Sequence, residues 1–356
     1  MSEDHFLHRL LRALMMLGVC MIQVNCTSES RHSDRGVKIQ SVTLDARNKP
    51  SDALLPQLKR LGVTHITLVQ FGFQSSIEST EIRMNPNARW YSESDQGIRE
   101  LSKSADSLGL YIILKPHLWL GGYNVGGQSR NEIGYINEQS WVSWESDYTA
   151  FLMHYAHLSQ EIRADVLVIG TELARSAHER PDYWKMLIQQ VRSVYDGKLT
   201  YAANWWEEYE DIKFWHLLEY IGVQAYFELS DQPNPSEQML AEGWYPYQKM
   251  LSDLSTHYDR PILFTELGYR NVDDAAAQPW RWPSRNEIGV TDSNSELQAR
   301  LYTAFFNQFW NEPWFAGVII WKWHGDLERR RTAQLGFTPQ GKPSEDVMRQ
   351  WFTANQ

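Results

Sequence analysis

The stretch Val166-Leu167-Val168-Ile169-Gly170-Thr171-Glu172 is an apolar, largely β-branched run that ends in a carboxylate. A second stretch, Ile262-Leu263-Phe264-Thr265-Glu266-Leu267-Gly268, has the same form and the same Thr-Glu pair. Short apolar runs of this kind are typical of strands buried on both faces, as in a parallel sheet. A carboxylate at the tip of such a strand is costly unless it is paired, hydrogen-bonded or functional.

Six further runs of the same kind bring the number of predicted strands to eight. In chain order they are Val37–Leu44, His65–Gln70, Leu110–His117, Asp165–Glu172, Leu199–Asn204, Tyr220–Tyr226, Pro261–Glu266 and Val318–Trp321. Amphipathic segments separate the strands, and residues 52–61 place four leucines on one helical stripe: Leu54, Leu55, Leu58 and Leu61. Pro181 suits the first turn of a helix that runs to Tyr195. The run Ser293-Asn294-Ser295-Glu296 predicts a capping box ahead of a helix over 297–310.

This alternation predicts an α/β fold, a (β/α)8 TIM barrel that forms a single catalytic domain over residues 37–356. The predicted strand ends Leu44 and Trp321 are 277 residues apart, or about 40 residues per unit, against about 31 in an ordinary barrel. Two insertions, 121–140 and 271–292, account for the excess and should lie on the active-site face. A doubly wound sheet would need a glycine-rich turn after its first strand, and residues 44–48 contain no glycine.

The composition favours a carbohydrate ligand over a nucleic acid. The net charge is −10, which excludes a broad basic face, and no nucleic-acid or membrane-surface partner is expected. The chain has 16 Trp, 17 Tyr and 13 Phe, more amphipathic rings than a core alone needs, so part of this aromatic surface should meet a ligand such as a sugar ring. No metal-ligand or nucleotide motif is present, so no cofactor is expected.

Residues 1–26 have the form of a secretory signal peptide or lipoprotein leader. Basic residues precede a ten-residue apolar run, 13–22, that is too short to span a bilayer. The polar residues 27–36 predict a flexible tether. Both cysteines, Cys20 and Cys26, lie in the leader, and Cys26 resembles a lipidation site, although Gln23-Val24-Asn25 before it depart from the usual small residues. We therefore expect export to the periplasm, the cell surface or the medium; an uncleaved N-terminal helix is the alternative.

Glu172 and Glu266 end the fourth and seventh predicted strands, whose tips meet over one axial pocket in a barrel. Two carboxylates placed there are the equipment for glycoside hydrolysis, although either one alone would more often be a helix cap or an ion-pair partner. The other strand ends supply the amine, imidazole, amide, indole and phenol groups that a sugar pocket needs, and the predicted substrate-binding residues are Lys115, His117, Asn204, Trp205, Tyr226 and Trp321.

At these positions the sequence resembles glycoside hydrolase family 113, (β/α)8 enzymes of the clan A retaining glycosidases known chiefly as endo-β-1,4-mannanases. The segments that carry the resemblance are Leu114–His117, Ile169–Glu172, Tyr201–Trp205, Gly222–Tyr226, Phe264–Tyr269 and Gly317–Trp323. The resemblance implies that Glu172 is the acid/base, Glu266 the nucleophile, Tyr226 its hydrogen-bond partner and Trp321 the platform at the cleaved sugar. Many clan members have Asn before the acid/base, whereas this chain has Thr171, which looks normal for the suspected family.

Three hypotheses for the function follow. The first is an endo-acting retaining hydrolase of β-1,4-mannosidic bonds in mannan or manno-oligosaccharides, whose two carboxyl groups should lie about 5–5.5 Å apart. The second is a retaining glycosidase of another β-linked glycan. The third is a non-catalytic carbohydrate-binding surface lipoprotein with a decayed site. A monomer is expected, because no exposed heptad pattern suggests assembly.

Overall fold

The computed structural model describes residues 38–121, 128–282, 284–326 and 333–354. The predicted leader (1–26) and tether (27–36), with Cys20 and Cys26, lie outside the described residues. Among the helices that are described, none is both long and apolar enough to cross a membrane.

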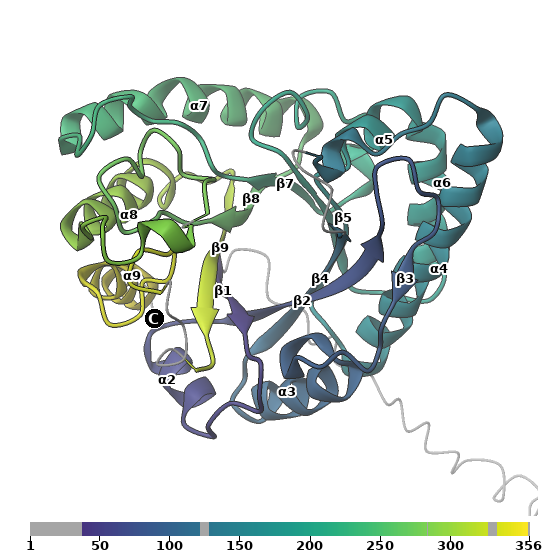
Figure 1. Ribbon diagram of the computed structural model, residues 1–356, viewed down its shortest axis with the longest axis horizontal. Helices are drawn as coiled ribbons and strands as arrows, with labels where there is room; N and C mark the ends of the chain where they lie inside the picture. Colours follow the sequence, from purple (N-terminus) through teal and green to yellow (C-terminus); the bar gives the residue numbers. More distant parts are fainter. Residues whose placement is uncertain (1–37, 122–127, 283, 327–332, 355–356) are drawn as a thin grey trace, which may run out of the picture. The chain divides into compact units, whose positions relative to one another are not determined.

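Eight parallel strands close into a barrel, seen end-on in Figure 1. The sheet order is β1-β9-β8-β7-β6-β5-β4-β2, and pairing of β1 with β2 completes the circle. At the closure, Ser41 of β1 is in register with His65 of β2 and Ile319 of β9. The predicted TIM barrel is therefore confirmed. Its strands are β1 (Ile39–Asp45), β2 (His65–Gln74), β4 (Tyr111–Leu120), β5 (Val166–Thr171), β6 (Lys198–Ala203), β7 (Tyr220–Gln224), β8 (Ile262–Leu267) and β9 (Phe315–His324).

Helices surround the barrel and join its successive strands (Figure 1). A short strand, β3 (Arg83–Met84), pairs antiparallel with the end of β2. The α-helices are α2 (Leu54–Arg60), α3 (Asp95–Ser107), α4 (Glu138–Ile162), α5 (Ala174–Glu179), α6 (Pro181–Arg192), α7 (Glu237–Tyr258), α8 (Ser295–Phe309) and α9 (Pro343–Thr353). Single 3-10 turns are η1 (Tyr91–Glu93), η2 (Arg130–Glu132), η3 (Trp215–Leu217) and η4 (Arg285–Glu287).

The helix signals in the sequence are largely confirmed, with one correction. Pro181 occupies the first turn of α6, and the predicted leucine stripe of α2 is buried. The capping box predicted from Ser293 does not form, because helix α8 begins at Ser295 and Ser293 lies one residue before the N-cap position. Its N-cap is Asn294, whose side chain accepts a hydrogen bond from the Leu297 N–H at 2.8 Å. Asn, Asp and Ser cap helices about equally well, so local sequence does not distinguish the two starts.

Two apolar layers lie on either side of the barrel wall. Alternate residues such as Val166 and Val168 of β5 belong to a small cluster with Ile113 and Leu263, whereas Leu167 belongs to the large cluster shared with the helices. Because side chains alternate along a strand, Lys115 follows Ile113 into the interior of the barrel. The interior thus changes from apolar to charged toward the carboxyl ends of the strands, where the barrel's ligands bind.

Candidate active site

Glu172 directly follows β5 and has a left-handed backbone, with φ of +52°. Its N–H donates to the carbonyl oxygen of Ala202 on the neighbouring strand at 2.8 Å, which fixes the turn. Oε2 accepts hydrogen bonds from Nε and Nη2 of Arg130 at 2.9 and 2.6 Å, and Oε1 accepts one from Nε2 of Gln224 at 3.1 Å. Non-glycine residues held in this conformation cluster at functional sites.

Glu266 lies on β8 and is almost completely buried. Oε1 accepts a hydrogen bond from the ammonium of Lys115 at 2.6 Å, and Oε2 accepts one from the Tyr226 hydroxyl at 2.7 Å. Burial alone would raise the pKa of Glu266, but the Lys115 charge and the two hydrogen bonds outweigh it and hold the pKa below its usual value. Glu266 is therefore held as an ionised carboxylate at neutral pH.

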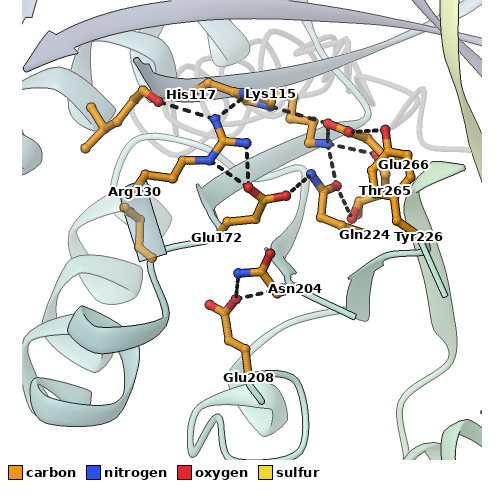
Figure 2. A network of polar contacts seen from close by, with 12 residues as sticks. Lys115, His117, Arg130, Glu172, Asn204, Glu208, Gln224, Tyr226, Thr265 and Glu266 are labelled. Atoms are coloured by element: carbon orange, nitrogen blue, oxygen red, sulfur yellow. Dashed lines mark hydrogen bonds and ion pairs between the residues drawn. The ribbon is translucent and has the colours of Figure 1, made fainter. Parts of the chain in front are cut away.

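Gln224 connects the two glutamates across the barrel mouth (Figure 2). Its Oε1 accepts hydrogen bonds from the Lys115 ammonium at 2.8 Å and from the Thr265 hydroxyl at 3.1 Å. Lys115 also donates to the Thr265 carbonyl oxygen at 2.8 Å. One continuous chain of hydrogen bonds therefore runs from Glu266 through Lys115 and Gln224 to Glu172.

His117 lies between Arg130 and the second glutamate. Its Nε2 is 3.9 Å from Oε1 of Glu266, and Nη1 of Arg130 is 3.5 Å from its Nδ1. Burial, followed by the charges of Arg130 and Lys115, lowers the pKa of His117 well below its ordinary value. The imidazole is therefore neutral. Its plane is parallel to that of the Trp321 ring, and the two ring centroids are 6.4 Å apart.

Asn204 follows β6 and is oriented by Glu208. The Glu208 Oε2 accepts hydrogen bonds from the backbone N–H of Asn204 at 2.7 Å and from its side-chain N–H at 2.8 Å. One side-chain N–H of Asn204 is thus committed to the protein, and the bond fixes the orientation of the amide whose oxygen is an acceptor for the cavity that Asn204 lines.

A cavity of about 1030 Å³ opens over the two glutamates. Seven of the eight predicted site residues line it: His117, Glu172, Asn204, Trp205, Tyr226, Glu266 and Trp321. The eighth, Lys115, is fully buried beneath Glu266 and its ammonium contacts protein acceptors only. The structure therefore brings all eight together, but it places Lys115 under the cavity wall.

Exposed rings form the rim of this cavity and come from the ends of β2 and β4 and from the loops after β6 and β8: Phe73, Trp119, Trp206, Trp280 and Trp282. Trp282, 56% exposed, meets Trp321 edge-to-face at 6.2 Å. The ammonium of Lys322 lies 5.3 Å from each of these two rings and 2.5 Å from the Asp45 carboxylate. A cavity with aromatic walls and a few fixed polar groups suits a ligand that has both an apolar face and hydroxyl groups.

Four contributors to the site were not predicted as site residues: Arg130, Gln224, Glu208 and Trp282. Gln224 stands two residues before Tyr226 within the predicted strand Tyr220–Tyr226, so strand periodicity could have identified it. Arg130 and Trp282 lie in the two insertions that were expected on the active-site face. Among the described residues, no group of three or more His, Cys, Asp or Glu side chains could hold a metal ion.

The fold and the site together define a (β/α)8 glycoside hydrolase: a parallel barrel with two glutamates at strand ends beneath a cavity walled by rings. Residues 40–352 match the model of Glycoside Hydrolase Family 113, and the chain belongs to this family. The resemblance carried by the strand-end motifs is thus confirmed.

Solved structures share this fold. A GH113 β-mannanase from Alicyclobacillus acidocaldarius, AaManA in complex with ManMIm, superposes with a TM-score of 0.76 at 24% identity over 90% of this chain and 98% of that one. A GH113 β-1,4-mannanase superposes with a TM-score of 0.74 at 22% identity, over 89% of this chain and 99% of that one. A family 5 mannosidase from Rhizomucor miehei superposes with a TM-score of 0.61 at 11% identity, over 92% of this chain and 95% of that one. No curated protein sequence matches the chain.

Proposed function

We propose that this glycoside hydrolase cleaves internal β-1,4-mannosidic bonds of mannan or manno-oligosaccharides with retention of configuration. The observation that carries the proposal is the pair of glutamates at the barrel mouth, one held ionised by Lys115 and the other bound to Arg130 and Gln224. The names of the family 113 neighbours, which are β-mannanases, support mannan as the substrate.

In the first step, the ionised Glu266 attacks the anomeric carbon and forms a glycosyl ester, while Glu172 delivers a proton to the departing oxygen. In the second step, Glu172 takes a proton from water, which attacks the same carbon and frees Glu266. In the structure both oxygens of Glu172 accept hydrogen bonds, which is the arrangement of the base form. To act as the acid, Glu172 must be protonated when substrate binds, and the protonated oxygen must give up a hydrogen bond that it accepts here.

The cavity is consistent with an internal stretch of polysaccharide. Its exposed rings stand at the ends of β2 and β4 and on the loops after β6 and β8, so they surround the glutamates instead of closing one side. Trp321 and Trp205 pack close to Tyr226, next to the proposed nucleophile. A sugar chain that extends past the cleaved unit in both directions would meet rings at each end, which supports endo action.

The test is release of reducing sugar from β-mannan, glucomannan, xylan and β-glucan by the wild type, by Glu266→Ala and by Glu237→Ala. Glu237 is exposed in the first turn of α7 and serves as the matched control. We expect release from the mannans, loss of at least about 10³-fold in Glu266→Ala, and no change in the control. Release of reducing sugar from xylan or β-glucan alone would refute mannan as the substrate. Tight binding of a glycan without any release would favour the non-catalytic hypothesis.

The stereochemical course and the cleavage pattern are separate measurements. Proton NMR of the first product should show the β-anomer before mutarotation; an initial α-anomer would refute the nucleophilic role of Glu266. Chromatography of early products from manno-oligosaccharides should show internal cleavage. Release of mannose alone from one chain end would contradict endo action.

We also propose export of the protein, on the strength of residues 1–26. Mass spectrometry of protein from a bacterial host should show removal of the leader, with a diacylglycerol addition if Cys26 is the lipidated residue. An intact N-terminus in the cytosolic fraction would contradict export.

A further inference from the structure

Glu208 is a buried carboxylate beside the site that the proposed mechanism does not use. It follows β6 by five residues and is 1% exposed. Three donors converge on it: the backbone and side-chain N–H groups of Asn204 on Oε2, and the Tyr201 hydroxyl on Oε1 at 2.5 Å. All three of these donors are neutral groups, and no cation is among the largest influences on its pKa. A buried carboxylate held only by neutral donors is costly, so its presence calls for a role.

Tyr201 extends the reach of Glu208 to the proposed acid/base. While its hydroxyl donates to Glu208, its oxygen accepts a hydrogen bond from the Leu173 N–H at 2.7 Å. That N–H directly follows the left-handed backbone of Glu172. The Tyr201 ring fits closely over Gly170, where an added Cβ would stand 2.7 Å from it. Packing therefore fixes the ring, and Glu208 fixes the direction of its hydroxyl.

We propose that Glu208 is a positioning residue of this site: as a carboxylate it orients the Asn204 amide and, through Tyr201, the backbone that carries Glu172, and on protonation it releases part of this hold. In Figure 2 Glu208 lies below Asn204, on the side away from Glu266. The inference rests on the proposed role of Glu172, which it deepens.

The geometry requires the ionised form. A carboxylate is an acceptor on both oxygens, which matches three donors, whereas a protonated oxygen is a donor that must displace one of them. Burial is the largest influence and raises the pKa of Glu208 to about 7, against the lowering effect of the Asn204 and Tyr201 hydrogen bonds; the charge of Glu172 raises it further. The titratable groups with the largest effect on it are Tyr201 of β6 and Glu172 after β5. The change of form therefore falls in the neutral range.

The experiment compares kcat and KM of the wild type and Glu208→Gln from pH 5.5 to 8.5, on a glycan that the wild type cleaves. At the acidic end the wild type carries neutral Glu208, so the two kcat values should agree within about twofold. At the alkaline end the wild type has the carboxylate, and the variant should be about 10-fold slower, the size of effect expected from a small misplacement of a catalytic group. Glu210→Gln, an exposed neighbour, is the matched control and should give a ratio near one throughout. A ratio of wild-type kcat to Glu208→Gln kcat that does not change between pH 5.5 and 8.5 would overturn the proposal.

A second readout is independent of activity. Hydrogen exchange of the Leu173 amide, followed by mass spectrometry of its peptide, should be about 10-fold faster in Glu208→Gln than in the wild type at pH 8 and equal at pH 5.5. Equal exchange at both values would overturn the proposal even for a chain that cleaves no glycan. Failure of the proposed function is seen separately, as a wild type that is inactive on every substrate.

If Glu208→Gln does not fold, Tyr201→Phe takes its place. Loss of one donor makes the carboxylate harder to ionise, so the neutral-range change in kcat should move to higher pH, and the Leu173 amide should exchange faster at every pH. An unmoved profile together with unchanged exchange would overturn the proposal.

Discussion

Replacing Lys115 by Met removes the buried cation beside the proposed nucleophile and keeps the length of the side chain. At the 2.6 Å between the Lys115 ammonium and the Glu266 carboxylate, an effective dielectric constant of about 20 gives an attraction of about 6 kcal/mol. Part of this offsets the cost of burying both charges, so the expected loss in the free energy of unfolding at pH 7 is about 3–5 kcal/mol. The hydrogen bonds of Lys115 to Gln224 and Thr265 are lost as well.

The loss should depend on pH in a definite direction. The wild-type Glu266 has a lowered pKa, so its stabilising contribution is present above the unfolded pKa of about 4.3 and is lost as pH falls through the folded pKa. In Lys115→Met, burial prevails and raises the pKa of Glu266. The contribution then changes sign, and stability falls as pH rises above about 4.3. The difference between the two proteins should therefore widen from about pH 4 to pH 7.

Urea unfolding at several pH values measures this difference, and kcat/KM should fall at least about 100-fold at pH 6 because a protonated carboxyl group does not attack. The control is Lys49→Met, which removes an exposed lysine beside Glu100 and should leave the urea midpoint unchanged. A difference that stays constant between pH 4 and 7 would refute the assignment of Lys115 as the group that keeps Glu266 ionised.

Three more outcomes are expected. Tyr226→Phe removes a hydrogen bond worth about 1.5–3 kcal/mol to the ionised Glu266, so kcat/KM should fall roughly 10- to 100-fold and its acidic limb should move to higher pH; a pH–rate profile with an unmoved limb contradicts this. Trp282→Ala should raise KM for polymeric substrate about 3- to 10-fold with little change in kcat, and an equal fall in kcat would place the ring in catalysis instead. Gly170→Ala puts a methyl group against Trp184 and Tyr201 and should cost about 1–3 kcal/mol in thermal unfolding; an unchanged midpoint would show that both rings can move.

The strands could be predicted from the sequence because burial on both faces leaves a continuous apolar run, and each of the eight runs became a barrel strand. The two glutamates could be found because a charged residue at the end of such a run is unusual. The N-cap of α8 was misplaced by one residue, since Ser293 and Asn294 are both good caps and only tertiary packing decides between them.

Arg130 and Glu208 were beyond the reach of the sequence for a different reason. Arg130 is 42 residues from its partner Glu172 and stands in an irregular insertion, where no periodicity indicates which way a side chain points. Glu208 stands in a segment, Glu207 to Asp211, where four of five residues are acidic, and nothing local marks it as the buried one. Such residues are placed by the path of the loop, which depends on the whole barrel.

The Lys115 ion pair has a consequence for the lifetime of the glycosyl ester. While Glu266 is esterified it carries no charge, so the ammonium beneath it is left with neutral acceptors, the Gln224 and Thr265 oxygens, in a fully buried position. A cation stranded in this way destabilises the covalent intermediate relative to the free enzyme. Its hydrolysis restores the carboxylate and relieves the imbalance. The barrel interior thus works against accumulation of the ester, and turnover should show no pre-steady-state burst on natural glycans.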